Sequence, residues 1–266
     1  MLLRSAWADP NATFVGVKAC DCRWNHGDQD AGSFVVSWGG ERWVSDLGAD
    51  NYGLDNYFGS DRFKYYRKNS LGHSTLSFNH SVQVAQDCGG QSLPGPQPPA
   101  PSETFITSFG SASGTAFPAP PGHGLLTCVP RVGEEQACTT VDLSAAYQGQ
   151  GVTAVVRRVA LRLDGAVRVT DSWVAARDGV PVAAALQTYA DVAVAADGAS
   201  ALLSRGGRTM RVSLAAGSAC AGATMTASPV RLHSPFYTTY NLTRIDVGGV
   251  TSSSCTGLDV ILKGAE

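Results

Sequence analysis

Long hydrophobic runs are missing from this sequence. No segment of its 266 residues approaches the roughly 20 apolar residues that a membrane-spanning helix needs, so we expect no membrane span. The opening residues, MLLRSAWADP, also lack the apolar stretch of a signal peptide, because they carry a charge at Arg4 and become polar by Asp9. We expect that any export signal belongs to a part of the protein upstream of Met1.

Charged residues are scarce as well. They make up 16% of the chain, and the formal net charge is −2. This balance offers no broad electrostatic attraction for nucleic acid or anionic membranes, so we expect no nucleic-acid partner. A hydrophobic content of 44% nevertheless fits a folded protein, and 266 residues can bury the core of one large all-β domain or two small ones.

Motifs of several common functional classes are absent. No C-x-x-C pair or zinc-finger spacing occurs, and Ser33 lies in A-G-S-F rather than in the G-x-S-x-G elbow of a serine hydrolase. A segment rich in proline, glycine and serine at about residues 89–124 predicts an exposed loop insertion. A disulfide from Cys88 to Cys128 or Cys138 would close this loop and limit its entropy.

The cysteines that are present favour an oxidising environment. Cys20 and Cys22 would lie roughly 7 Å apart on a strand, which makes a bond between them difficult. We expect an extracytoplasmic protein with some disulfides and one unpaired thiol, because the number of cysteines is odd. The seven are Cys20, Cys22, Cys88, Cys128, Cys138, Cys220 and Cys255.

The second half of the chain has the pattern of antiparallel sheets. From Thr139 onward, runs such as GVTAVVRRVALRL and GAVRVTDSWVAA alternate with Asp-Gly, Gly-Gly or Pro signals. Turn signals at this spacing are typical of meanders in stacked sheets. We therefore interpret this half as scaffold.

Residues able to do chemistry concentrate between residues 24 and 76. There, SFVVSW and ERWVSDLG flank Gly39-Gly40, which predicts a β-hairpin with a two-residue turn. His26, Asp28 and Asp30 precede the first strand, and Asp46 follows the second. Because these two ends of an antiparallel hairpin are neighbours, we expect a site there.

The motifs NHGDQDAGSFVV, GERWVSDLG, YFGSDRFKYYR and GHSTL, with VDLSAAY and VALRLDGAVRVTDSW further on, carry a family likeness. In order and spacing they resemble the C-terminal β-sheet domain of the heparinase II/III-like polysaccharide lyases, whose usual pattern is H-G-H-x-D-x-G-S-F, then D-x-G, then H-N-T-L. The resemblance implies an all-β antiparallel multi-sheet β-sandwich over residues 1–266. It also implies an N-terminal helical α/α toroid, upstream of Met1, as the partner domain.

The resemblance implies cleavage of an acidic polysaccharide at a uronic acid by β-elimination. His26 would neutralise the substrate carboxylate or assist proton transfer, since a histidine titrates near neutral pH. Tyr57 would handle a proton at the cleft, and Tyr52 is the competing tyrosine. A loop histidine bonded to a nearby aspartate is the alternative role of His26.

The resemblance also implies a structural divalent metal held by Asp28, Asp46 and His73. Asp28 stands where many members have a second histidine, so zinc is the first candidate and calcium or manganese are possible. A hydrogen-bonded Asp–His pair without metal is the alternative. Ser74 departs from the asparagine of the family's H-N-T-L.

Substrate binding is predicted for two cations, Arg62 and Arg67. With Lys64 they alternate along DRFKYYRK, which would put like-spaced side chains on one face of a strand. A solvated strand face is the alternative interpretation.

Two other functions stay open: a carbohydrate-binding or structural β module without turnover, and a relative of uronate C5-epimerases. Loss of the toroid would leave this chain alone unable to complete the elimination.

Overall fold

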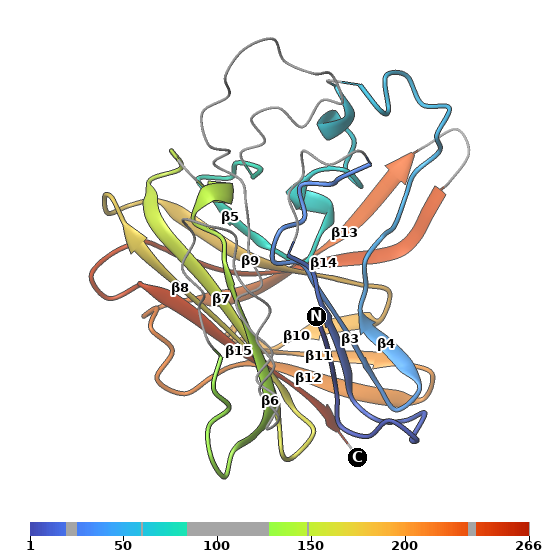
Figure 1. Cartoon of the computed structure of the whole chain (residues 1–266), viewed down its shortest axis with the longest axis vertical. Coiled ribbons are helices and arrows are strands. Elements are labelled where there is room, and N and C mark those ends of the chain that lie inside the picture. The colour runs from blue at the N-terminus through green and yellow to red at the C-terminus, as the bar shows by residue number, and fades with distance from the viewer. Residues whose placement is uncertain (20–25, 60, 84–127, 148, 234–237, 266) are drawn as a thin grey trace.

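The computed structural model describes residues 1–19, 26–59, 61–83, 128–147, 149–233 and 238–265, and these residues form three antiparallel sheets (Figure 1). Within this part of the chain, regular structure consists of strands and short 3₁₀ turns, so the predicted all-β antiparallel fold is confirmed. The structure contains no helix, over the same residues, that could cross a membrane.

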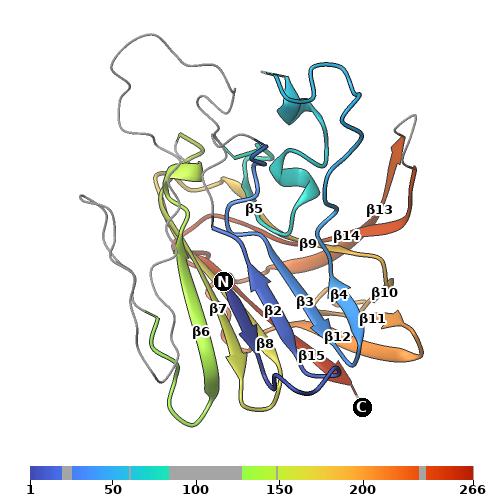
Figure 2. The ribbon, with the colours of Figure 1, turned by 45° about the vertical axis from the view of Figure 1, so that its right-hand side comes forward.

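The first sheet contains the predicted hairpin. Its strand order is β1-β2-β3-β4, and in Figure 2 it stands as one blue layer. Gly39 and Gly40 have φ of 63° and 81°, the left-handed values that a tight two-residue hairpin turn requires. The strands are β1 Leu2–Arg4, β2 Phe14–Val17, β3 Phe34–Trp38 and β4 Glu41–Val44.

The largest sheet comes from the second half of the chain. Its order is β10-β11-β12-β15-β8-β7-β6, so the C-terminal strand lies between β12 and β8. Side chains of β8 alternate between buried and accessible along most of its length, as expected for a sheet with one covered face. The strands are β6 Glu135–Asp142, β7 Val152–Arg162, β8 Val167–Ala175, β10 Asp191–Val194, β11 Ser200–Arg205, β12 Arg208–Leu214 and β15 Gly257–Ala265.

The third sheet, of order β13-β14-β9-β5, joins the two halves of the sequence. The alternating run LSFNHSVQV predicts a long strand, but β5 covers only Leu76–Phe78 and all three residues are buried. The strand is therefore confirmed over these three residues only, because Asn79 and His80 take φ of 52° and 57°, which turns the chain out of the sheet. The other strands are β9 Pro181–Thr188, β13 Thr224–His233 and β14 Thr238–Val250.

One hydrophobic core connects the sheets. Phe78 of β5 packs edge-on against Tyr147 and Trp173, with ring centroids 5.1 and 5.7 Å away. Trp43 of the first sheet belongs to the same buried cluster and donates its indole N–H to the carbonyl of Trp38 over 2.9 Å. The core therefore fixes the first sheet against the scaffold and gives the loops at its edge a rigid base.

Two disulfides lie in the described residues, Cys128–Cys138 and Cys220–Cys255. The expectation of some disulfides is confirmed. Cys128 and Cys138 pair with each other across a separation of 10 residues, and the predicted bridge from Cys88 involves a residue outside the described part of the chain. Cys20, Cys22, Cys88 and the predicted loop at 89–124 lie outside the described residues.

Candidate functional site

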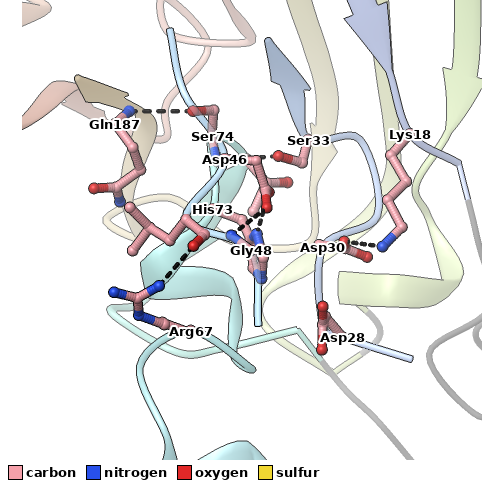
Figure 3. A network of polar contacts seen from close by, with 12 residues as sticks. Lys18, Asp28, Asp30, Ser33, Asp46, Gly48, Arg67, His73, Ser74 and Gln187 are labelled. Carbon is pink, nitrogen blue, oxygen red and sulfur yellow. Dashed lines mark hydrogen bonds and ion pairs between the residues drawn. The ribbon is translucent and has the colours of Figure 1, made fainter. Parts of the chain in front are cut away.

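Three segments meet at one end of the first sheet and build a polar cluster (Figure 3). Asp28 and Asp30 come from the loop before β3, Asp46 follows β4, and His73 follows the 3₁₀ turn η2 Ser70–Gly72, just before β5. The hairpin brings the first two segments together, as the sequence predicts. Pairing of β5 with β9 then places His73 beside them.

His73 and Asp46 form the central contact of this cluster. His73 Nδ1 lies 2.8 Å from Asp46 Oδ2, and the His73 side chain is 1% exposed against 38% for Asp46. Burial opposes ionisation of Asp46, but the bond to His73, its charge and the Gly48 N–H lower the Asp46 pKa to about 2. Burial also lowers the pKa of His73, but the Asp46 bond and the charges of Asp30, Asp46 and Asp28 raise it overall. Asp46 is therefore an acceptor, and His73 Nδ1 is the donor.

Two carboxylates, those of Asp28 and Asp30, lie close to the His73 ring. Asp28, Asp30 and His73 each offer one ligand atom, and these atoms all lie within 4.8 Å of one another. His73 Nε2 is buried and has no hydrogen-bond partner among the described residues. This donor set of one imidazole and two carboxylates suits a divalent metal. The structure thus brings Asp30 into the predicted ligand group and places Asp46 behind His73, as the carboxylate that orients the ring.

Lysines balance the acidic residues of the cluster. Lys68 Nζ lies 2.6 Å from Asp28 Oδ1 and also reaches the His26 carbonyl at 3.4 Å, while Lys18 pairs with Asp30. The Lys68 side chain is 5% exposed, which is rare for lysine unless it is paired. The sequence places Lys68 among the cations that could meet a polyanionic substrate, but it does not predict the pairing with Asp28, because only burial distinguishes Lys68 from its neighbours.

His26 occupies an exposed position at the rim of the cluster. Its φ of 64° is uncommon for a residue with a side chain, and such backbone conformations often occur at functional sites. The ring lies 4.8 Å from Phe58 and 6.3 Å from Tyr52, measured between centroids. The structure therefore presents an imidazole to solvent beside aromatic rings.

The two candidate tyrosines differ sharply in accessibility. Tyr57 is 1% exposed, and its hydroxyl accepts a hydrogen bond from the backbone N–H of Asp50 over 2.8 Å. Burial raises the pKa of Tyr57. Tyr52 is 61% exposed, and its ring lies 5.8 Å from that of Tyr57. Tyr52 is thus the tyrosine whose hydroxyl can meet a ligand without movement of the loop.

The predicted strand of cations is not formed. Residues Arg62–Lys64 are a 3₁₀ helix, η1, because Lys64 N–H and Tyr65 N–H bond back to the carbonyls of Asp61 and Arg62. Arg62 is buried beside the Phe63 ring, and Lys64 is 74% exposed, so the two do not share a face. Arg67 donates to the Leu47 carbonyl over 2.6 Å, which ties the segment after β4 to the site.

Ser74, which stands where the family usually has asparagine, is hydrogen-bonded to two other segments of the chain. Its backbone N–H donates to Ser33 Oγ over 3.3 Å, and its own Oγ accepts from the backbone N–H of Gln187 over 3.1 Å. Figure 3 shows Ser74 between these two residues. The residue after His73 is therefore bonded on both sides, to the site loop and to β9.

An antiparallel β-sandwich with a histidine and acidic site at the edge of its first sheet defines the class of this domain. The sequence matches the family described as "Heparinase II/III-like, C-terminal" over residues 6–247, and the chain belongs to this family. A search of curated proteins found no match.

Solved structures support the fold. The chain is similar to the crystal structure of the heparan sulfate lyase HepC from Pedobacter heparinus, with a TM-score of 0.68 and 14% identity over 100% of this chain. It is also similar to a crystal structure of heparinase III, with a TM-score of 0.66 and 12% identity over 99% of this chain. The chain spans 35% of the length of each of these proteins.

Proposed function

We propose that this chain is the β-sandwich part of a polysaccharide lyase that cleaves acidic, uronic-acid-containing polysaccharide by β-elimination. In this reaction a base removes the C5 proton, a C4–C5 double bond forms, and the bond from C4 to the glycosidic oxygen breaks as that oxygen gains a proton. The observation that carries the proposal is the exposed imidazole of His26. Its backbone has a left-handed conformation, and it lies beside the cluster of Asp28, Asp30, Asp46 and His73.

His26 has two uses in such a reaction. As an imidazolium it neutralises the uronate carboxylate, which makes the C5 proton more acidic, and as a neutral imidazole it transfers a proton. Its backbone carbonyl is held by Lys68, so the ring projects from a fixed point. A tyrosine hydroxyl next to it would protonate the leaving oxygen. The role of Tyr57 stays a prediction, and the exposure of Tyr52 favours Tyr52 as the group that reaches the sugar.

A toroid domain is the proposed partner of this chain in the complete protein. The chain spans 35% of the HepC structure, which leaves room for a further domain in a protein of that size. The proposed elimination needs additional groups to position the substrate, and misplacement of reacting groups costs powers of ten in rate. We also propose an extracytoplasmic location, which the two disulfides support.

We propose that Asp28, Asp30 and His73 hold a structural divalent metal, with zinc as the first candidate. When bound, the metal would cross-link the loop before β3 to the segment before β5. Zinc should raise the melting temperature of the chain, and Asp28→Asn or Asp30→Asn should weaken zinc binding by about tenfold or more. Asp197→Asn, which alters a distant aspartate at a turn, is the control and should bind zinc as wild type does. Equal zinc affinity in all four proteins would contradict this ligand set.

The function is tested by the absorbance of unsaturated products from a series of uronate polysaccharides. The assay uses the full-length protein, from the upstream reading frame, and this chain alone. We expect product from the full-length protein and its loss in His26→Ala. His80→Ala is the matched control, because His80 is also an exposed histidine with positive φ but lies beyond β5. Absence of unsaturated product from every uronate would overturn the lyase proposal.

A carbohydrate-binding module without turnover is the second candidate. It is supported by Tyr52, whose 61% exposed ring beside His26 offers a surface for stacking on sugar that needs no turnover. Uronate binding that persists in His26→Ala and Tyr57→Phe, without any product, would support it. Exchange of the C5 hydrogen with solvent in the absence of unsaturated product would instead indicate an epimerase-like activity.

A further inference from the structure

Arg157 is a buried arginine of the scaffold that contacts the two loops of the site. It lies on β7 in the seven-stranded sheet, and its side chain is 1% exposed. One guanidinium nitrogen, Nη1, donates to the carbonyl of Gly32 and to the carbonyl of Ser74, each over 2.8 Å. Gly32 belongs to the loop that carries Asp28 and Asp30, and Ser74 directly follows His73.

Asp171 fixes the guanidinium in this position. Arg157 Nε lies 2.7 Å from Asp171 Oδ1, and Nη2 lies 2.9 Å from Oδ2, so the pair is bidentate. The two residues are register partners on β7 and β8, and Asp171 is equally buried. A bidentate arginine–aspartate pair has a fixed plane, so the remaining nitrogen points in one direction.

This arrangement joins the site loops through one atom. The carbonyls of Gly32 and Ser74 come from segments 42 residues apart in the sequence, and both bond the same Nη1. Ser74 N–H also bonds Ser33 Oγ, which adds a second link between the same segments. A lysine could replace the charge of Arg157, but its single ammonium could not bond Asp171 in bidentate fashion while holding two carbonyls.

We propose that Arg157, oriented by Asp171, is a positioning residue that sets the separation between the Asp28–Asp30 loop and His73. Its catalytic consequence rests on the proposed function, because a site built from two loops works only at one spacing of those loops. Its structural consequence is independent of the proposed function. The guanidinium holds the backbone next to His73, and so maintains the bond from His73 Nδ1 to Asp46.

The test compares Arg157→Lys with Arg158→Lys. Arg158 is the next residue on β7 and also forms a bidentate ion pair, with the buried Glu135, but none of its side-chain hydrogen bonds within the described residues reaches the site loops. The first readout is the proton resonance of His73 Nδ1–H, assigned by its loss in His73→Gln. We expect this resonance in wild type and Arg158→Lys, and its loss or shift in folded Arg157→Lys.

The second readout is elimination by the full-length protein. We expect Arg157→Lys to lower kcat by about tenfold or more with little change in KM, and Arg158→Lys to stay within about twofold of wild type. If Arg157→Lys does not fold, Asp171→Asn serves instead, because it keeps the shape of the pair and removes its charge. It should change both readouts in the same direction.

The outcomes separate this inference from the proposed function. A wild-type protein that eliminates nothing refutes the lyase proposal, and the His73 resonance still decides the role of Arg157. A folded Arg157→Lys with a wild-type His73 resonance overturns the positioning role, as does an equal change in Arg158→Lys.

Discussion

His73 donates its Nδ1 proton to Asp46 across 2.8 Å, and this bond joins the segment after β4 to the segment before β5. The imidazole is buried while the carboxylate remains 38% exposed, so the pair connects the interior of the site to its surface. Because Nδ1 is engaged, Nε2 is the ring nitrogen that no hydrogen bond occupies among the described residues. The orientation of the ring is thus decided by Asp46.

The His73–Asp46 pair predicts a maximum of stability in mildly acidic solution for the metal-free chain. The Asp46 pKa of about 2 lies below the unfolded value of about 3.9, so its contribution is lost as the pH falls toward the folded value. The His73 pKa is raised, so its contribution is complete below about pH 6.5 and is lost as the pH rises through the folded value. The free energy of unfolding, measured by denaturant titration over a pH range that includes both declines, tests this profile.

Asp46→Asn is the variant that tests this pH profile. It should reduce both the acidic and the alkaline decline in the free energy of unfolding. We expect the Asp46 side to contribute about 1 kcal/mol, because solvent screens a side chain that is 38% exposed. An unchanged alkaline decline in both Asp46→Asn and His73→Gln would show that another group titrates.

Tyr57→Phe should affect stability, whereas Tyr52→Phe should affect the rate of elimination. Loss of the Tyr57 hydroxyl leaves the Asp50 N–H without its acceptor and should cost about 1 kcal/mol of stability. Tyr52→Phe should leave stability unchanged and lower the rate of elimination by the full-length protein. Denaturation and product assays on both variants decide between them. Full activity in Tyr52→Phe, with loss of activity in an equally stable Tyr57→Phe, would restore the assignment of Tyr57.

Ser74→Ala should destabilise the fold. The substitution removes the acceptor of the buried Gln187 N–H, and an unsatisfied buried donor costs about 1–3 kcal/mol. Ser81→Ala is the control, since Ser81 makes an exposed bond to Asn79 and should change stability by less than about 0.5 kcal/mol. Equal stabilities of the two variants would mean that another group satisfies Gln187.

The two disulfides should contribute unequally. Cys220–Cys255 closes a separation of 35 residues and Cys128–Cys138 one of 10. Chain-entropy estimates give roughly 4 and roughly 3 kcal/mol for loops of these lengths. Paired serine substitutions measured by denaturation should follow this order. A larger loss from the Cys128–Cys138 pair would show that local packing, rather than loop length, decides the effect.

The sequence was enough to predict the fold class and the segments that form the candidate site. Alternating β-branched runs and turn signals predict antiparallel sheets, because side-chain alternation and left-handed glycine turns are local properties of a chain. Gly39-Gly40 is an example, since its turn needs no tertiary contact to be recognised. The same hairpin placed Asp46 near Asp28, and the resemblance of the surrounding motifs added His26 and His73.

The roles of individual cations could not be predicted from the sequence, because they depend on burial. Arg62 and Arg67 have the same chemistry whether they face a ligand or the interior, and nothing local to DRFKYYRK shows that Arg62 is covered. The burial of Lys68 and its pairing with Asp28 were not predictable for the same reason. Alternation in this run predicts a strand, whereas the i to i+3 hydrogen bonds of η1 depend on how the loop packs.

What the sequence by itself determined is the set of elements and the chemical groups in the loops, because turns, alternation and residue types are encoded locally. Only the tertiary structure decided which groups meet. It paired His73 with Asp46, brought Asp28 and Asp30 close to the His73 ring, and let Arg157 bond both loops. These relationships join segments that are distant in the chain, and they follow from the packing of three sheets around one core.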